Sequence, residues 1–164
     1  MRKITFDHVK FNFKNLLENV IGEGELQFLN QDIDLLKREN DQSTIYHKKY
    51  YDWAHTEDFQ SVYRSFIEQN IKPLYGEKIV FQRIPTFRVA FQNNIAVGEF
   101  HKDKAYRNID WAEKVQEDNF FLPFTDAFDT NTIWVESEED KGDFSAMKCN
   151  YGECIQWDGS NLTH

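Results

Sequence analysis

The sequence has 164 residues, of which 40% are hydrophobic and 29% charged, and its formal net charge is −9. This length predicts a single domain, residues 1–164, with one buried core. The negative charge disfavours nucleic acid and anionic membranes as partners, and no stretch of the sequence reaches the ~20 apolar residues that span a bilayer. We therefore expect a cytoplasmic protein whose cysteines, Cys149 and Cys154, are reduced and packed in a sheet.

Residues 1–75 are predicted to form a mostly helical N-terminal layer. The strongest pattern lies between Phe59 and Ile71, where apolar residues recur with the spacing of one helix face. Thr56 or Asp58 can cap the start of this helix, and a lysine–proline pair marks its end.

Two weaker helical patterns cover residues 13–21 and 26–38. Residues 39–50 are rich in Asn, Asp, Gln and Lys, so we expect them to form a solvated loop. Three histidines of this part lack the spacing of metal ligands and are expected at the surface: His8, His47 and His55.

After Gly76 the sequence predicts short strands separated by turns such as Tyr151-Gly152. The candidate strands are residues 78–83, 86–91, 96–103, 119–124, 132–137, 145–150 and 154–157. An aromatic content of 16% also favours β-structure. We therefore expect an α+β, mainly β fold, in which residues 76–164 form a double-stranded β-helix, a barrel of the jelly-roll or cupin type. The acidic residues Glu136, Glu138, Glu139 and Asp140 are predicted to form a solvated turn.

Two candidate metal ligands, His101 and Asp103, are separated by one residue within the predicted strand 96–103. Residues i and i+2 of a strand project from the same face, so this imidazole and this carboxylate are expected to meet at one point. His164 follows after a gap long enough for several antiparallel strands to bring it beside them. Two histidines and one carboxylate are the ligand set of non-haem Fe(II) oxygenases, although His-x-Asp alone is a weak signal.

Five ordered segments resemble the Fe(II)/2-oxoglutarate-dependent oxygenases. They are PTFRV (85–89), VGEFHKDKAY (97–106), NFFLPFTDA (119–127), TNTIWVES (130–137) and WDGSNLTH (157–164). More narrowly, they resemble the hydroxylase-like proteins of streptomycin biosynthesis, which are distantly similar to phytanoyl-CoA dioxygenases. The resemblance covers roughly the C-terminal half of the chain.

The resemblance implies a hydroxylase that binds Fe(II), uses 2-oxoglutarate and O2 as co-substrates, and acts on a small metabolite or a sugar-derived intermediate. The implied iron ligands are His101, Asp103 and His164. The residues expected to bind co-substrate or substrate are Asn119, Asn131, Thr132 and Arg88. The first three of these can equally satisfy backbone groups in a bend.

The family pattern also places an arginine after the distal histidine, where it pairs with the far carboxylate of 2-oxoglutarate. That position lies beyond His164, so we expect the sequence to be truncated at its C-terminus. In an untruncated chain, Arg88 or Arg83 could take this role, and Arg88 could equally form a structural ion pair.

Two alternative functions stay open at this point. The chain could be a cupin-type metal enzyme that does not use 2-oxoglutarate, or a non-catalytic barrel that binds a metal or another ligand. Neither the oligomeric state nor the role of residues 1–75 is predicted.

Overall fold

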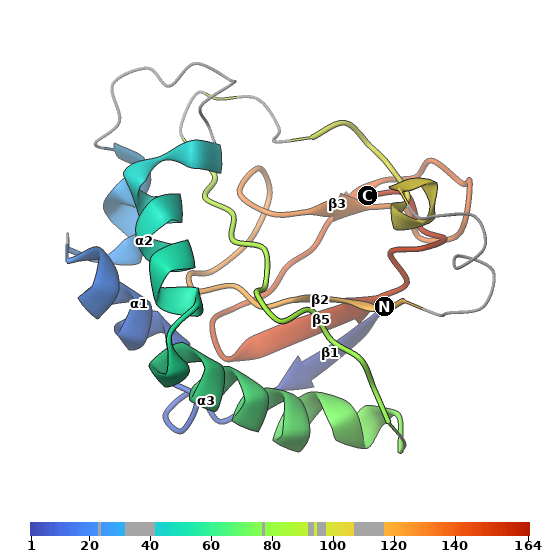
Figure 1. Cartoon of the computed structure of the whole chain (residues 1–164). Helices are drawn as coiled ribbons and strands as arrows, with labels where there is room; N and C mark the ends of the chain where they lie inside the picture. The colour runs from blue at the N-terminus through green and yellow to red at the C-terminus, as the bar shows by residue number, and fades with distance from the viewer. Residues whose placement is uncertain (23, 32–41, 77, 92–93, 95–97, 107–116) are drawn as a thin grey trace. The chain divides into compact units, whose positions relative to one another are not determined.

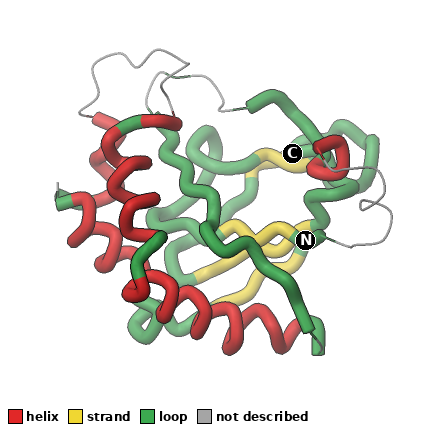
Figure 2. Tube along the Cα trace, viewed as in Figure 1, coloured by secondary structure: helices red, strands yellow, loops and turns green. Residues whose placement is uncertain are grey.

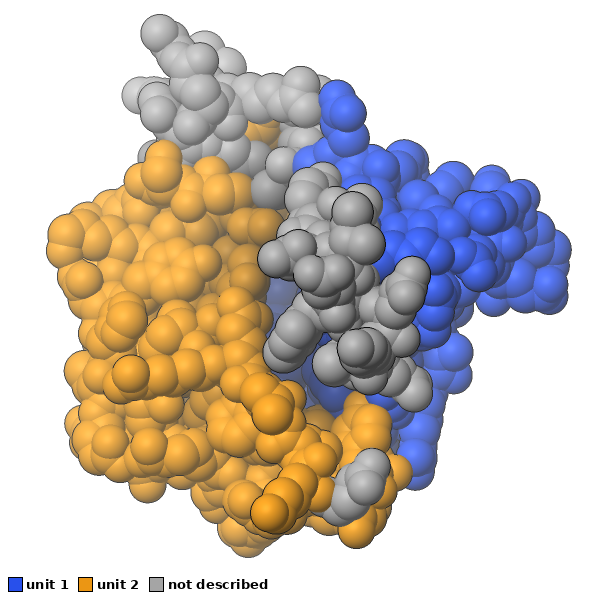
Figure 3. Space-filling model, turned by 45° about the vertical axis from the view of Figure 1, so that its right-hand side comes forward, with its two compact units in different colours: residues 1–6, 98–164 blue, residues 7–97 orange. Residues whose placement is uncertain are grey.

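The computed structural model describes residues 1–22, 24–31, 42–76, 78–91, 94, 98–106 and 117–164 (Figure 1). The chain divides into two compact units, coloured separately in Figure 3. Unit 1 comprises residues 1–6 and 98–164, and unit 2 comprises residues 7–97. The single domain predicted from chain length stays a prediction.

Unit 2 contains the three α-helices of the described chain, α1 (Phe13–Ile21), α2 (Ile45–Ala54) and α3 (Glu57–Phe66) (Figure 2). The helix predicted at 13–21 is confirmed as α1, which ends at Gly22 in the left-handed conformation that glycine adopts without strain. The pattern at 26–38 begins as a 3₁₀ helix, Leu26–Gln31, and residues 32–38 lie outside the described residues.

The helix predicted between Phe59 and Ile71 is also confirmed. It consists of α3 followed by a π-helical turn, Ile67–Ile71, and a 3₁₀ turn, Lys72–Leu74, that contains the proline. Thr56 caps its start, because the Thr56 hydroxyl accepts a hydrogen bond from the backbone N–H of Phe59.

The loop predicted at residues 39–50 is wrong from Ile45 onward, where α2 begins. Residues 39–41 lie outside the described residues. The buried face of α2 is built from Tyr46, Tyr50 and Trp53, whose spacing is helical. These rings bury large areas although most other residues of the segment are polar. The polar composition therefore predicted a loop where the structure has a helix.

The strands predicted at 78–83 and 86–91 are wrong, because both segments are irregular. Side chains of the helices, rather than a neighbouring strand, satisfy their backbone groups. These hydrogen bonds run from Tyr63 Oη to Gln82 O (2.9 Å), from Gln60 Nε2 to Arg83 O (3.0 Å), from Tyr50 Oη to Pro85 O (3.1 Å) and from Phe87 N to Tyr51 Oη (3.3 Å).

The core of unit 2 is largely aromatic. Tyr50 stacks on Phe87 with ring centroids 4.5 Å apart, and Trp53 meets Phe59 edge-on at 4.8 Å. Aromatic residues therefore also form the core of this helical unit. A high aromatic content does not indicate β-structure in unit 2.

The described strands all belong to unit 1 and form two small sheets. One is antiparallel with the order β1 (Arg2–Thr5), β5 (Glu153–Trp157), β2 (Asn119–Phe121), as Figure 1 shows. The other pairs β3 (Trp134–Val135) with β4 (Ser145–Ala146).

The strands predicted at 119–124, 132–137, 145–150 and 154–157 are confirmed in place as β2 to β5, although β2, β3 and β4 are shorter than predicted. Strand β1 was not predicted. The sheets pack around a buried cluster made of Ala127, Val135, Met147, Cys149, Ile155 and Trp157.

The strand predicted at 96–103 is wrong over its described part. Residues 98–102 are irregular, and a 3₁₀ turn, η5 (Asp103–Tyr106), follows them. The fold is thus mixed helix and sheet, and the described strands form no closed barrel. The double-stranded β-helix stays a prediction.

No helix in the described part of the chain is both long and apolar enough to cross a membrane. Cys149 and Cys154 are both buried and unbridged, and burial raises the pKa of the Cys154 thiol to about 12. Their thiols therefore stay protonated and unreactive at neutral pH.

Candidate metal centre

Unit 1 brings His101, Asp103 and His164 together. One ligand atom from each residue can be chosen so that all three lie within 4.8 Å of one another. His101 Nε2 lies 3.6 Å from Asp103 Oδ1, and His164 Nε2 lies 3.9 Å from Asp103 Oδ2. The two nitrogens thus approach the two oxygens of one carboxylate, as three ligands on one face of an ion would.

Backbone hydrogen bonds hold the two ligand segments side by side. His101 N donates to His164 O (2.9 Å), and His164 N donates to His101 O (3.0 Å). Asp103 N donates to Gly159 O at 2.9 Å. These antiparallel contacts, rather than a regular strand, bring the three side chains together, so the grouping was predicted correctly although the strand was not.

The remaining ring nitrogen of each histidine is fixed by a backbone carbonyl. His101 Nδ1 lies 2.8 Å from Glu99 O, and His164 Nδ1 lies 3.0 Å from Leu162 O. A carbonyl oxygen only accepts hydrogen bonds, so each neutral ring carries its proton on Nδ1. The unprotonated Nε2 of each ring lies on the side of Asp103, which is the usual arrangement of a metal-binding imidazole.

Asn119 orients the carboxylate. Strand β2 pairs with β5 and places the Asn119 amide so that its Nδ2 donates to Asp103 Oδ2 at 2.6 Å. A Cβ atom on Gly159 would lie 2.3 Å from Asn119 Nδ2 and 2.7 Å from Asp103 Oδ2. Only glycine fits at position 159, because any side chain there would displace this pair.

Glu136 is a residue of the site that the sequence analysis misplaced in a solvated turn. Its side chain is buried, with 1% of the residue exposed. The Glu136 carboxylate accepts hydrogen bonds from Thr163 N (2.6 Å) and Gly142 N (3.1 Å), and Glu136 N donates to Thr163 O (3.1 Å). These hydrogen bonds lower the pKa of the Glu136 carboxyl to about 2, and the bond from Thr163 N makes the largest contribution.

Glu136 therefore fixes the residue that immediately precedes His164. No local signal could have located it, because alternation along the strand places Glu136 on the opposite face from the buried Val135, on the side of the exposed Trp134.

The other acidic residues of this turn are exposed, as predicted. Two of them, Glu139 and Asp140, bind lysines that neighbour His101 and Asp103 in the sequence. Lys102 Nζ lies 2.5 Å from Asp140 Oδ1 and 3.2 Å from Glu139 Oε1, and Lys104 Nζ lies 2.7 Å from Glu139 Oε1. These ion pairs connect the turn after β3 to the segment that carries His101 and Asp103.

The remaining predicted co-substrate residues do not join the three ligands. Asn131 is exposed and bonds the backbone of its own turn, with Phe128 N 2.6 Å from Asn131 Oδ1. Thr132 Oγ1 donates to Met147 O at 2.8 Å. Arg88 and Arg83 are exposed residues of unit 2. For Asn131, Thr132 and Arg88 a role in co-substrate binding stays a prediction.

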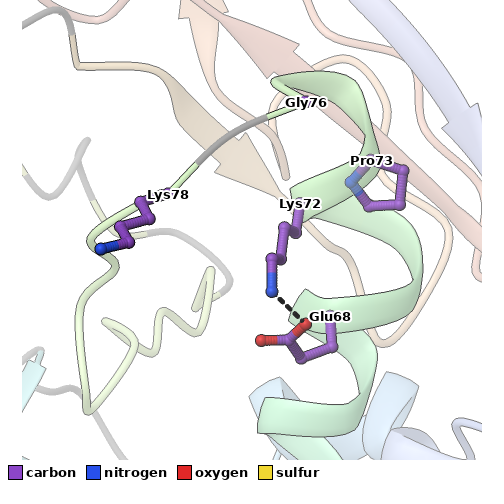
Figure 4. Close-up of a pocket in the computed structure, with 5 residues that line it drawn as sticks. All are labelled: Glu68, Lys72, Pro73, Gly76 and Lys78. Atoms are coloured by element: carbon purple, nitrogen blue, oxygen red, sulfur yellow. Dashed lines mark hydrogen bonds and ion pairs between the residues drawn. The ribbon is translucent and has the colours of Figure 1, made fainter.

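A hollow of about 490 Å³ on unit 2 is a second place to look for a site (Figure 4). It is lined by Glu68, Lys72, Pro73, Gly76 and Lys78. Lys72 Nζ pairs with Glu68 Oε2 at 2.7 Å, as the dashed line shows. One carboxylate and two lysines do not form a set of metal ligands, so the cluster in unit 1 is the stronger candidate for a metal centre.

The residues of this cluster fit a divalent transition metal. The donor set is two neutral imidazoles and one carboxylate, which suits Fe(II). Beside it, the absence of a side chain at Gly159 leaves room for Asn119 and Asp103. The buried Trp157 Nε1 has no hydrogen-bond partner in the described structure, which leaves a donor near the centre for a bound molecule.

Comparison with known proteins identifies one informative relative. The chain is 33% identical to the streptomycin biosynthesis protein StrG of Streptomyces griseus over 165 residues, which cover 99% of this chain and 74% of that protein. No protein-family model matches the sequence. No solved structure matches it either.

Proposed function

Because the chain belongs to the family of the streptomycin biosynthesis protein StrG, we propose that it is a biosynthetic enzyme. More narrowly, we propose an Fe(II)- and 2-oxoglutarate-dependent oxygenase that hydroxylates a small metabolite or a sugar-derived intermediate on a double-stranded β-helix. The observation that carries this proposal is the grouping of His101, Asp103 and His164 with both Nε2 atoms toward one carboxylate.

The ligand set explains why oxygen chemistry is favoured over a structural metal role. Structural zinc sites are closed by four protein ligands, whereas three ligands on one face leave positions for exogenous molecules. Iron bound here would supply the oxidation, together with a 2-oxo acid and O2. The protein's own tasks are to hold the ion, to orient the bound molecules and to exclude water.

The residues of unit 1 divide these tasks. His101, Asp103 and His164 would hold the metal, and Asn119 keeps one carboxylate oxygen oriented by a hydrogen bond of 2.6 Å. The buried cluster that includes Val135 and Trp157 contains no carboxylate and no imidazole, and the Trp157 ring packs against His164.

The test is an anaerobic titration of the purified protein with Fe(II), with and without 2-oxoglutarate, recorded as a visible absorption spectrum. We expect a weak metal-to-ligand charge-transfer band that requires both components. The band should disappear in His101→Ala and persist in His55→Ala, whose imidazole is exposed in unit 2.

Iron binding without the band would reject 2-oxoglutarate as co-substrate and favour a cupin-type enzyme or a non-catalytic barrel. Failure of the wild-type protein to bind iron at all would reject the metal centre itself.

A further inference from the structure

Trp157 carries a buried donor that the protein does not use. Trp157 is 5% exposed, and its indole Nε1–H has no hydrogen-bond partner in the described structure. Trp134, in the same unit, differs in this respect, because its Nε1 donates to Asp129 O at 2.8 Å. A buried N–H without an acceptor is costly and uncommon in native proteins, so an acceptor from outside the chain is the natural explanation.

The indole lies at the metal centre. Its ring meets the His164 imidazole edge-on, with centroids 5.5 Å apart and an angle of 79° between the planes. Trp157 is also the direct partner of Asn119 in the pairing of β5 with β2. Directly opposed residues of antiparallel strands project from the same face. Trp157 thus shares its face with the side chain that binds Asp103.

The nearby protein acceptors are already engaged. Asp103 Oδ2 accepts from Asn119, and Leu162 O accepts from His164 Nδ1. On its other sides Trp157 packs in the apolar cluster with residues such as Val135 and Ile155, which offer no acceptor side chain. A molecule that binds beside His164 would supply the acceptor that Nε1 lacks.

We propose that Trp157 Nε1–H donates a hydrogen bond to a carboxylate or keto oxygen of a 2-oxo acid bound at the metal centre. The inference rests on the proposed function, because it requires that a 2-oxo acid occupies the positions beside the three ligands. It assigns to Trp157 a role in orienting that co-substrate, in addition to its packing in the core.

The first experiment observes the indole N–H directly in the wild-type protein. The chain has four tryptophans, and their indole ¹H–¹⁵N signals are recorded with Zn(II) as a diamagnetic probe, before and after 2-oxoglutarate is added. We expect the Trp157 signal to shift, and its hydrogen exchange to slow, on addition of 2-oxoglutarate. The Trp134 signal should stay in place. A Trp157 signal that responds to Zn(II) but not to 2-oxoglutarate would overturn the inference.

The second experiment removes the donor and keeps an aromatic ring. Trp157→Phe should weaken 2-oxoglutarate binding to the Fe(II)-loaded protein by about tenfold, the effect of one hydrogen bond to a charged acceptor, and leave Fe(II) affinity unchanged. Trp134→Phe is the matched control, because its indole donates only to a backbone carbonyl of its own turn. Should Trp157→Phe fail to fold, substitution of the other three tryptophans assigns the Trp157 signal by elimination.

The two proposals fail in different ways. A wild-type protein that forms no 2-oxoglutarate-dependent absorption band would overturn the proposed function. A normal band with equal 2-oxoglutarate affinity in Trp157→Phe and wild type would overturn the role of Trp157 alone.

Discussion

The histidines of the two units show how neighbours decide what an imidazole can do. In unit 2, His47 is 2% exposed, so the surface position expected for it is wrong. Both of its ring nitrogens have side-chain partners, Nδ1 with Thr44 Oγ1 (2.8 Å) and Nε2 with Gln42 Oε1 (3.0 Å). In unit 1, His101 and His164 each bind a backbone carbonyl with Nδ1 and turn Nε2 toward a carboxylate.

The difference separates a structural histidine from a ligand. Side-chain partners on both nitrogens leave His47 no lone pair for a metal, and burial first, then the Arg88 charge, lowers its pKa to about 4. In His101 a backbone carbonyl accepts from Nδ1, and Nε2 lies 3.6 Å from the Asp103 carboxylate. Five measurements test this difference between the residues of the two units.

The largest expected effect is on metal binding. His101→Ala should reduce Fe(II) affinity by more than about a hundredfold, since loss of an outer partner alone costs about 10- to 100-fold. Anaerobic equilibrium dialysis measures the affinity, and circular dichroism confirms that the variant is folded. His55→Ala is the matched control, and an equal loss in both variants would contradict the assignment of the centre.

His47→Ala should act on stability instead. Loss of a buried ring, with Thr44 and Gln42 left unpaired, is expected to lower the free energy of unfolding by about 2–4 kcal/mol. Fe(II) affinity measured below the unfolding transition should be unchanged. The contrast would be wrong if His47→Ala weakened metal binding as strongly as His101→Ala.

Asn119→Ala removes the hydrogen bond to Asp103 Oδ2 and should lower Fe(II) affinity by about 10- to 100-fold. Asn131→Ala is the control from the same unit, because Asn131 bonds only its own turn. Asn131→Ala should change thermal stability more than affinity. Equal affinities in Asn119→Ala and wild type would show that the amide does not orient the carboxylate.

Glu136 gives unit 1 a pH dependence of its own. Because the folded-state pKa of about 2 lies below the usual glutamate value of 4.5, the ionised carboxylate stabilises the fold above pH 4.5. That contribution is lost as the pH falls toward 2. Glu136→Gln should lose stability at neutral pH and show a flatter decline between pH 4.5 and 2, as urea unfolding at a series of pH values would reveal. An unchanged slope would contradict this prediction.

The smallest effect is the pH dependence that His47 gives unit 2. The folded-state pKa of His47, about 4, lies below the usual histidine value of 6.5. As the pH falls, His47 is therefore protonated in the unfolded chain before it is protonated in the folded one. Stability should therefore fall as the pH drops from 6.5 toward 4, a window above that of Glu136. In His47→Gln this decline should be weaker. A decline of the same size in the variant would assign it to other groups.

The sequence predicted the elements with local signals. The face from Phe59 to Ile71 and the Thr56 cap identify α3, because both depend on neighbours within one helix. Segments 78–83 and 86–91 have strand-like composition, yet side chains of the helices bond their backbone groups. Tyr63 and Gln60 donate to carbonyls of the first segment. In the second segment, Phe87 N donates to Tyr51 Oη. Such partners are distant in sequence, so no local pattern reports them.

At the candidate metal centre, too, the sequence predicted what depends on residue type and missed what depends on distant partners. Residue types and order suffice to nominate His101, Asp103 and His164, since imidazole and carboxylate have a fixed ligand chemistry. Glu136 could not be distinguished from its acidic neighbours, because its burial depends on Thr163 and Gly142.

The amino-acid sequence was thus sufficient to predict the ligand types, helix α3 and the approximate positions of strands β2 to β5. Three further features became visible in the folded chain alone. Nδ1 of His101 and of His164 bonds a backbone carbonyl, and Gly159 leaves room for Asn119 beside Asp103. The Trp157 N–H is buried without a partner. The physical reason is that side-chain chemistry and helical periodicity are local properties, whereas burial and hydrogen-bond pairing depend on segments that meet only in the folded chain.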